Sequence, residues 1–229
     1  MVLLLTPTPE ATSPPPEGDR VMGLIARMEA AYAVVPAYQT EMEVSEYREG
    51  RVVETKRFLY TFKKPDHMRI DMKSPNPGMI LVYPDKGGKV GIKPGGWAGF
   101  LKLHLSPDST LLRASAGQQR IDQTDLGLLI KNIVHSLTDR RRGEIKVSGN
   151  DDRETVEVLA EDHFRAGLLT LYNFTIDTQR WLPVEVMEST PDGVLRRKVI
   201  LHNLKTAIAI PDSFFRIEGE NTGDDQRDR

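Results

Sequence analysis

The chain has 229 residues, a length that suits one large domain or two small ones. It carries 31 Lys and Arg against 33 Asp and Glu, a formal charge of -2, so it lacks the basic excess that nucleic-acid binding usually requires. It contains no cysteine, which excludes disulfides, thiol catalysis and cysteine-ligated metals.

The N-terminal segment is predicted to be a flexible spacer. Met1 to Leu5 are apolar but too few to cross a bilayer, which takes about 20 residues. They fit either the trimmed end of a secretory signal or a flexible addition, so we expect a complete signal peptide to be missing from this chain. Residues 6–17 read TPTPEATSPPPE, a proline-rich spacer that favours extended conformations. We predict that 1–18 are flexible, that 19–218 form a single domain, and that the charged tail 219–229 is disordered.

A first helix is predicted from Asp19 to about Val34. Asp19 is a suitable N-cap, and apolar residues follow it at helical spacing, namely Val21, Met22, Leu24, Ile25 and Met28. The helix should end before Pro36, because the residue that precedes a proline is disfavoured in helical backbone conformations. The amphipathic pattern indicates a helix that packs on a sheet.

The hydrophobic period then changes from helical to alternating, which predicts antiparallel strands. The segment 67–73 shows this most clearly, because Met68, Ile70 and Met72 face one way and charged or polar residues face the other. Glu49-Gly50 separates the first two strands as a turn. The strands expected in this half of the chain are 38–48, 51–63, 67–73, 79–83, 89–93 and 101–105.

A second helix is predicted in the middle of the chain. Thr124 or Asp125 is a candidate N-cap, and the apolar stripe that follows consists of Leu126, Leu129, Ile130, Ile133, Val134 and Leu137. The helix should stop near Asp139. The basic run 140–142 then either complements the helix dipole or offers a landing patch for an acidic partner or lipid headgroups.

The remainder is predicted to be a meander of antiparallel strands. These strands are 144–148, 154–160, 168–176, 183–189, 194–203 and a last short one near Phe214. About eleven antiparallel strands and two helices give an α+β protein that is mainly antiparallel β. Because a sheet of this size twists strongly, we expect a curved, incomplete β-barrel with the helices covering its concave face.

Motifs for catalysis or metal binding are missing from the sequence. The five histidines never occur at the spacing H-x-x-x-H, and no P-loop, G-x-S-x-G or G-x-G-x-x-G occurs. The C-terminal meander likewise contains no arrangement of residues that could catalyse a reaction. We therefore predict that the protein holds an apolar molecule, is not an enzyme, and uses no metal or cofactor.

Short motifs in a fixed order resemble the LolA/LolB/LppX-like lipoprotein-carrier superfamily over about residues 19–217. They are the first helix with Tyr38-Gln39-Thr40, the hairpin at Glu49-Gly50, Phe62-Lys63-Lys64-Pro65 with His67-Met68-Arg69-Ile70, the helix Leu126 to Leu137 in the place of the family's lid helix, Asp177 with Leu182-Pro183, Asp192-Gly193, Leu201-His202-Asn203, and Ile210-Pro211-Asp212 with Phe214. Each motif is short, and their order carries the resemblance.

The resemblance implies an unclosed barrel whose apolar cavity takes up acyl chains of lipoproteins or other lipids. It also implies a protein that is periplasmic, or otherwise exported, in a Gram-negative-type bacterium. In the family's carrier the residue before the strand-entry proline is an arginine that clasps the lid. Here it is Lys64, which can donate to lid carbonyls but lacks the five-donor fork of guanidinium.

Apolar residues on the strand faces and on the second helix are the candidate lipid contacts. They are Met42, Val44, Phe58, Tyr60, Phe62, Met68, Ile70, Met72, Leu126, Leu129, Ile130 and Ile133. Methionine suits this role because its flexible, polarisable side chain adapts to different ligands. The same residues would equally make a packed core between sheet and helix, so an open cavity and a filled core remain alternatives.

The predicted function is a periplasmic carrier or binding protein for lipoprotein acyl chains or another amphiphile. The alternative is an envelope sensor of the same fold that binds a protein partner. A lipid hydrolase ranks below both, since no nucleophile–base pair is visible in the sequence. We expect a monomer whose ligand is a lipid or a lipoprotein acyl chain, with envelope proteins as further partners, and no transmembrane segment in this chain.

Overall fold

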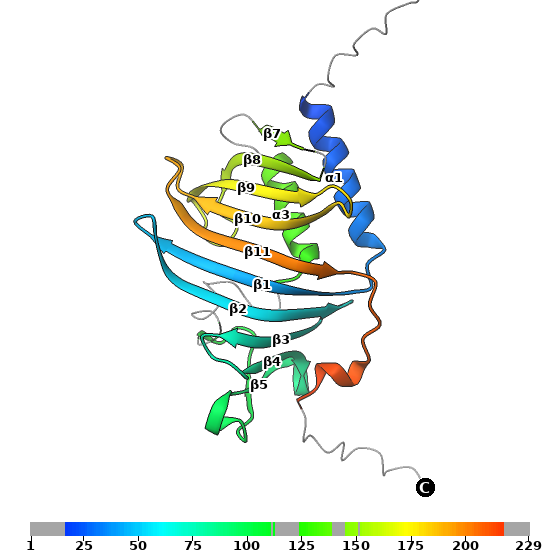
Figure 1. The fold of residues 1–229 in the computed structure, drawn as a ribbon, viewed down its shortest axis with the longest axis vertical. Coiled ribbons are helices and arrows are strands. Elements are labelled where there is room, and N and C mark those ends of the chain that lie inside the picture. Colours follow the sequence, from blue (N-terminus) through cyan, green and yellow to red (C-terminus); the bar gives the residue numbers. More distant parts are fainter. Residues whose placement is uncertain (1–16, 111, 113–123, 139–144, 151, 218–229) are drawn as a thin grey trace, which may run out of the picture.

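The computed structural model describes residues 17–110, 112, 124–138, 145–150 and 152–217. Its main element is an 11-stranded sheet in the order β6-β5-β4-β3-β2-β1-β11-β10-β9-β8-β7, accompanied by the helices α1 (Glu17–Ala33) and α3 (Leu126–Thr138) (Figure 1). The strands are β1 (Ala37–Arg48), β2 (Arg51–Lys63), β3 (His67–Ser74), β4 (Ile80–Asp85), β5 (Lys89–Lys93), β6 (Leu103–Leu105), β7 (Lys146–Gly149), β8 (Arg153–Glu161), β9 (Leu169–Asp177), β10 (Leu182–Ser189) and β11 (Leu195–Lys205). Short 3-10 turns lie at Lys86–Gly88, Gly96–Ala98 and Asp212–Phe215.

Two antiparallel meanders make up the sheet, and they join where the first strand pairs with the last. β1 through β6 follow one another outward on one side, and β11 through β7 do so on the other. The turn Glu49-Gly50 connects β1 and β2 with φ values of 53° and 74°, which is the two-residue geometry that matches the twist of a hairpin. β6 and β7 are the free edges of the sheet, so the barrel is not closed.

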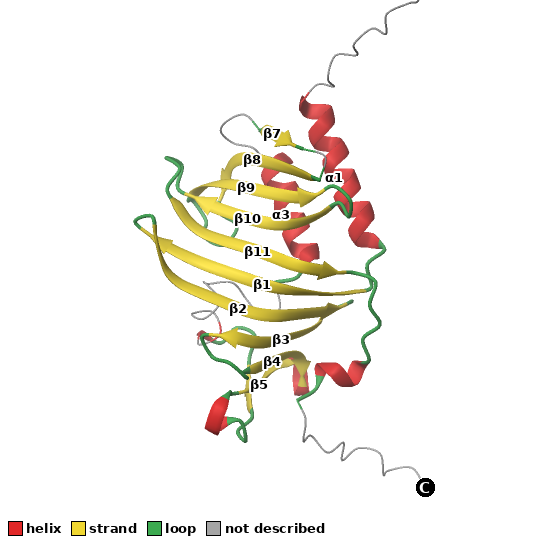
Figure 2. Ribbon diagram, viewed as in Figure 1, coloured by secondary structure: helices red, strands yellow, loops and turns green. Residues whose placement is uncertain are grey.

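Both helices lie on one face of the sheet, next to β8, β9 and β10 (Figure 2). α1 contributes Leu24 and Met28 to the core, and α3 contributes Ile133. The same core extends without interruption from Val90 on β5 to Val156 on β8. Because strands at opposite ends of the sheet share one core, the sheet curves around it and the helices cover the concave face, as the sequence predicted.

The predicted strand near Phe214 is wrong, because Asp212–Phe215 forms a 3-10 turn instead. Phe215 is buried and meets the ring of His67 edge-on, with 5.5 Å between the ring centroids. The Arg69 guanidinium lies 4.7 Å from the Phe214 ring centroid and donates to the Phe214 carbonyl oxygen at 2.9 Å. Side-chain anchoring on β3 therefore takes the place of a strand ladder.

The predicted element boundaries differ by a few residues at several ends. α1 begins at Glu17, so Gly18 is helical although the sequence placed it in the flexible spacer. β6 covers only Leu103–Leu105 of the strand expected over 101–105. Most of the segments predicted to be flexible, and the basic run 140–142, lie outside the described residues.

Candidate functional site

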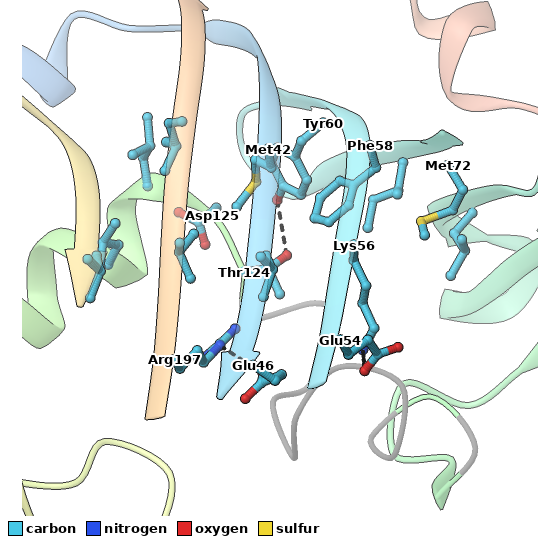
Figure 3. A pocket seen from close by; sticks show the side chains of 18 of the residues that line it. Met42, Glu46, Glu54, Lys56, Phe58, Tyr60, Met72, Thr124, Asp125 and Arg197 are labelled. Atoms are coloured by element: carbon cyan, nitrogen blue, oxygen red, sulfur yellow. Dashed lines mark hydrogen bonds and ion pairs between the residues drawn. The ribbon is translucent and has the colours of Figure 1, made fainter. Parts of the chain in front are cut away.

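A cavity of about 320 Å³ lies between the sheet and the beginning of α3. Its walls come from β1, β2, β3, β4, β10 and β11, from the loop between β3 and β4, from α3 and from the loop after β8. Figure 3 shows the part of the wall formed by Met42, Phe58, Tyr60 and Met72. The alternating faces of β1, β2 and β3 therefore leave a space between sheet and helix that the side chains do not fill.

Eight of the twelve predicted lipid contacts line this cavity. They are Met42, Val44, Phe58, Tyr60, Ile70, Met72, Leu126 and Leu129. The other four, Phe62, Met68, Ile130 and Ile133, are buried in the core and are not part of the cavity wall. The structure therefore contains both a cavity and a packed core, and the candidate residues divide between them.

The apolar stripe of α3 consists of two separate rows, which explains this division. Leu126, Leu129 and Asn132 follow one another at intervals of three residues and face the cavity. Ile130 and Ile133 belong to a second row that is buried in the core. Because residues three and four apart share one side of a helix, the sequence showed the two rows as a single stripe.

Three tyrosine and threonine hydroxyls hold the beginning of α3 against the sheet. The Tyr38 hydroxyl accepts a hydrogen bond from the Leu126 N–H at 2.8 Å, and the Tyr60 and Thr124 hydroxyls are 3.1 Å apart. Burial raises the pKa of Tyr38 well above its ordinary value, so the hydroxyl stays protonated. Sequence analysis placed Tyr38 in the first strand without a role. The one signal in the sequence was its spacing of four residues from Met42, which places both side chains on the same face of the strand.

Lys64, the predicted lid latch, contacts α1 and not α3. Its ammonium donates to the carbonyl oxygens of Tyr32 at 2.7 Å and of Ala33 at 3.1 Å, and lies 4.3 Å from the centroid of the Tyr32 ring. These carbonyls end α1 and have no partner within the helix, so a cation there stabilises the helix end. The link to α3 is indirect and runs through the Tyr32 side chain.

Asp125 caps α3 and connects it to α1. Its Oδ1 accepts hydrogen bonds from the N–H groups of Gly127 and Leu128, at 2.7 and 3.2 Å. The Tyr32 hydroxyl donates to the same oxygen at 3.2 Å. Burial, followed by the nearby Asp125 charge, raises the pKa of Tyr32. Of the two N-cap candidates, Thr124 and Asp125, the structure therefore uses Asp125, which also joins the two helices.

Charged side chains, namely Glu46, Glu54, Lys56 and Arg197, lie together at the end of the cavity away from Met42, Phe58 and Tyr60 (Figure 3). The Arg197 guanidinium lies between two carboxylates, with Nε 3.4 Å from Glu46 Oε1 and Nη1 3.3 Å from Glu188 Oε1. Lys56 and Glu54 form a second pair at 3.2 Å. Burial raises the pKa of Glu188 even though Arg197 favours its charged form. The cavity is thus apolar along one part and polar at its end, a feature that sequence patterns did not reveal.

His163 lines the cavity and forms a contact that sequence analysis missed. Its Nε2 lies 2.7 Å from the Ser136 hydroxyl oxygen, and its ring stacks on Tyr172 with 4.3 Å between centroids. Burial lowers the pKa of His163 to about 4, so the imidazole is neutral near neutral pH. A serine next to a neutral histidine is an arrangement that hydrolases use. Ser136, however, is only 1% exposed and does not line the cavity, so a substrate has no path to its oxygen.

The described residues contain no group of three or more His, Cys, Asp or Glu side chains able to hold a metal ion. Within the same residues, no helix is long and apolar enough to cross a membrane.

Neither a protein-family model nor a curated protein sequence matches this chain. Solved structures do match. An uncharacterized conserved protein from Thermus thermophilus aligns over 88% of this chain and 96% of its own, with 9% sequence identity and a TM-score of 0.51. The two proteins share a fold.

Two further structures are similar at lower scores. The Pseudomonas aeruginosa MucA/MucB complex aligns over 86% of this chain and 61% of the matched chain, with 14% identity and a TM-score of 0.46. A LolA superfamily protein from Nitrosomonas europaea aligns over 86% of this chain and 97% of its own, with 11% identity and a TM-score of 0.39. At these scores neither carries an argument about function, which we base on the site.

Proposed function

We propose that this protein binds the acyl chain of a lipoprotein or of another amphiphile and carries it through the bacterial periplasm. The observation that supports this most directly is the cavity between the sheet and α3, which is apolar along one part and charged at its end. An acyl chain would occupy the apolar part and its headgroup would lie at the charged end. The α3 helix would serve as the lid.

The apolar wall suits a flexible hydrocarbon chain. Met42, Met72 and Met79 line it together with Phe58 and Leu129, and all five are only partly buried. Transfer of each methylene from water into such a site stabilises the complex by about 0.8 kcal/mol. Methionine side chains adjust to chains of different shape. The volume of about 320 Å³ lies at the low end of ligand pockets, which favours one acyl chain over several.

The charged end suits a polar headgroup and opposes entry of a plain hydrocarbon. Arg197 lines the cavity between Glu46 and Glu188, and its Nη1 donates to Glu188 at 3.3 Å. A headgroup with acceptor oxygens would accept further hydrogen bonds from this guanidinium, which has five N–H donors. Lys56 lies in the same wall. We therefore expect an amphiphile whose head carries a carboxylate, ester or phosphate oxygen.

Release of the ligand requires α3 to move, and its contacts are suited to that. The first turn of α3 meets the sheet through the Tyr38 hydroxyl and the buried side chain of Leu126, and the Tyr60 hydroxyl lies 3.1 Å from that of Thr124 just before the helix. The second half of α3 packs into the core through Ile133 and Leu137. Opening the beginning of the helix would therefore withdraw Leu126 from the core, keep the contacts of Ile133 and Leu137, and expose the cavity.

The test of this proposal is native mass spectrometry of freshly purified protein, followed by solvent extraction and identification of any released lipid. We expect a retained single-chain or lipoprotein-derived species, and uptake of a fluorescent fatty acid after its removal. Phe58→Gln should weaken uptake about tenfold, because it places an amide in the apolar wall. Leu59→Gln is the matched control, since the neighbouring side chain points to the other face of β2.

The opposite result would overturn the proposal. A clean unliganded mass with no probe uptake would favour the alternative, an envelope module of the same fold that binds a protein partner. Equal weakening by Phe58→Gln and Leu59→Gln would show that probe binding does not depend on the cavity.

A further inference from the structure

An exposed apolar segment follows β5 and lies outside the cavity and the core. Trp97 is 88% exposed and Phe100 is 74% exposed, and Leu101 and Leu103 are also exposed. Large apolar side chains of this kind are costly to leave in water, and they cluster here within seven residues of sequence, from Trp97 to Leu103. We call residues 94–103 the aromatic loop. Nothing in the proposed acyl-chain site uses these side chains.

The charge around the aromatic loop is one-sided. Between Asp85 and Asp108 the sequence has four lysines, Lys86, Lys89, Lys93 and Lys102, and not a single Asp or Glu. Asp85 itself is mostly buried, and its Oδ2 lies 2.7 Å from Nδ1 of His104. The chain as a whole carries a formal charge of -2, so this segment is a local basic region on a slightly acidic protein.

We propose that the aromatic loop docks the protein onto an anionic lipid surface. Tryptophan and phenylalanine at a membrane interface bury their rings among the headgroups, while lysines beside them attract anionic lipids. The loop combines these two features. A protein partner would need complementary shape and acceptors, whereas a lipid surface needs only exposed rings and positive charge.

The position of the loop connects it to the cavity. Gly95 packs closely against residues 77–79, which connect β3 to β4. A Cβ added to Gly95 would collide with the carbonyl oxygen of Pro77. Asn76 and Met79, on either side of that contact, line the cavity. Figure 1 places β5 and the segment after it at the end of the sheet away from α1 and α3. Docking through the loop would therefore bring this wall of the cavity next to the lipid surface and leave α3 free to move.

The experiment measures binding to vesicles of equal parts phosphatidylglycerol and phosphatidylcholine by co-sedimentation at low and high salt. The wild-type chain is expected to bind, and salt is expected to weaken the binding. Trp97→Ser combined with Phe100→Ser should weaken it about tenfold or more. Val52→Ser combined with Val53→Ser is the matched control, because these valines are 54% and 55% exposed in the β1–β2 hairpin; it should stay within about twofold.

A fluorescence measurement reports on the loop itself. Trp181→Phe leaves Trp97 as the chain's one tryptophan and keeps a ring beneath the Arg27 guanidinium, which lies 4.4 Å from the Trp181 centroid. The emission of Trp97 should shift to shorter wavelength when the anionic vesicles are added. Lys102→Glu should weaken vesicle binding roughly fivefold or more.

Several results would overturn the docking proposal. They are absence of binding by the wild-type chain, equally tight binding to pure phosphatidylcholine vesicles, and equal losses for the serine pair and its valine control. A blue shift of Trp97 that depends on protein concentration without vesicles would show that a second copy of this chain covers the loop instead. Phe58→Gln is expected to leave vesicle binding unchanged, so failure of the acyl-chain proposal and failure of this one are distinguishable.

Discussion

The two halves of the sheet use the space beneath them differently. Beneath β8 and β9 the inward side chains Val156, Tyr172, Phe174 and Ile176 are completely buried, in a core to which both helices contribute. Beneath β1, β2, β3 and β4 a cavity remains, which extends to β10 and β11; within the described part of the chain, α3 borders it through Leu126, Leu129 and Asn132. Where the helices cover the sheet the interior is filled, and where one helix end overhangs it the interior is hollow. The position of the helices thus decides which apolar faces form a core and which form a site.

Side-chain type differs in part between the two regions. In the filled region the rings of Tyr172 and Phe174 stack with 5.3 Å between centroids. The cavity wall also contains aromatic and β-branched residues, but it adds Met42, Met72 and Met79, whose side chains hold no fixed shape. Rigid residues fill a core with one arrangement, whereas flexible ones tolerate both an empty and an occupied space.

The largest expected effect comes from truncating the same residue type in each half. Phe174→Ala should lower the free energy of unfolding by about 3–5 kcal/mol, because it opens a void in a closed core. Phe58→Ala removes an equal side chain from a wall that already borders a cavity, so it should cost only about 1–2 kcal/mol. Urea denaturation of both variants measures the difference. Equal losses would mean that the β1–β4 half is packed as tightly as the other.

The sequence was sufficient to predict the sheet, because alternation with a period of two and the turn residues between strands are local signals. The hairpin at Glu49-Gly50 follows from the same local chemistry, as does an N-cap at Thr124 or Asp125, of which the structure uses Asp125. The structure therefore contains all but one of the predicted strands, with ends that differ by a few residues. The exception is Phe214, where the outcome depended on a distant contact with Arg69 that no local pattern encodes.

The site was only partly predictable for the same physical reason. Alternation identifies which residues point inward, and Met42, Phe58 and Met72, which it placed on inward faces, line one cavity. It does not say how far a covering helix reaches, so it could not separate Leu129 in the cavity wall from Ile130 in the core. The charged end was invisible, since Glu46, Glu188 and Arg197 come from three strands that meet only in the folded sheet.

His163 lies on the boundary between the halves and should make stability depend on pH. Burial lowers its pKa to about 4 from the ordinary value of 6.5; Asp162 opposes this shift and His135 adds to it. Between these two values the unfolded chain binds a proton and the folded chain does not, so stability falls as pH falls through this window. From about pH 7 to about pH 5 the loss attributable to His163 is about 2 kcal/mol.

The control for this prediction is His163→Gln, which keeps a hydrogen-bonding side chain but does not titrate. Denaturation at the two pH values should show a smaller loss in the variant than in the wild-type chain. The loss in the variant has to be subtracted from the loss in the wild-type chain because other groups also titrate. Glu188, whose pKa is raised by burial, changes stability in the opposite direction as pH falls. An identical pH dependence in both proteins would mean that His163 is exposed to water, and that the filled half does not extend to it.

The smallest expected effect concerns how firmly the hollow half is closed. Tyr38→Phe removes the acceptor of the Leu126 N–H and leaves the rest of the buried ring in place. The global cost should be about 1 kcal/mol, since one hydrogen bond is lost. The first turn of α3 should open more often, so amide hydrogen exchange should become faster there. The amide of Ile133, in the packed half of the helix, should keep its protection.

Tyr60→Phe is the matched control for the closure of α3. Its hydroxyl pairs with Thr124, which also lies 3.5 Å from the sulfur of Met68 and so retains a weak acceptor when Tyr60 is changed. We therefore expect faster exchange for Tyr38→Phe than for Tyr60→Phe. If neither variant alters exchange at the start of α3, the helix is closed by apolar contacts through Leu126 and Leu129. Lid opening would then be governed by the same ligand-facing side chains that form the cavity wall, and binding and release would no longer be separable by mutation.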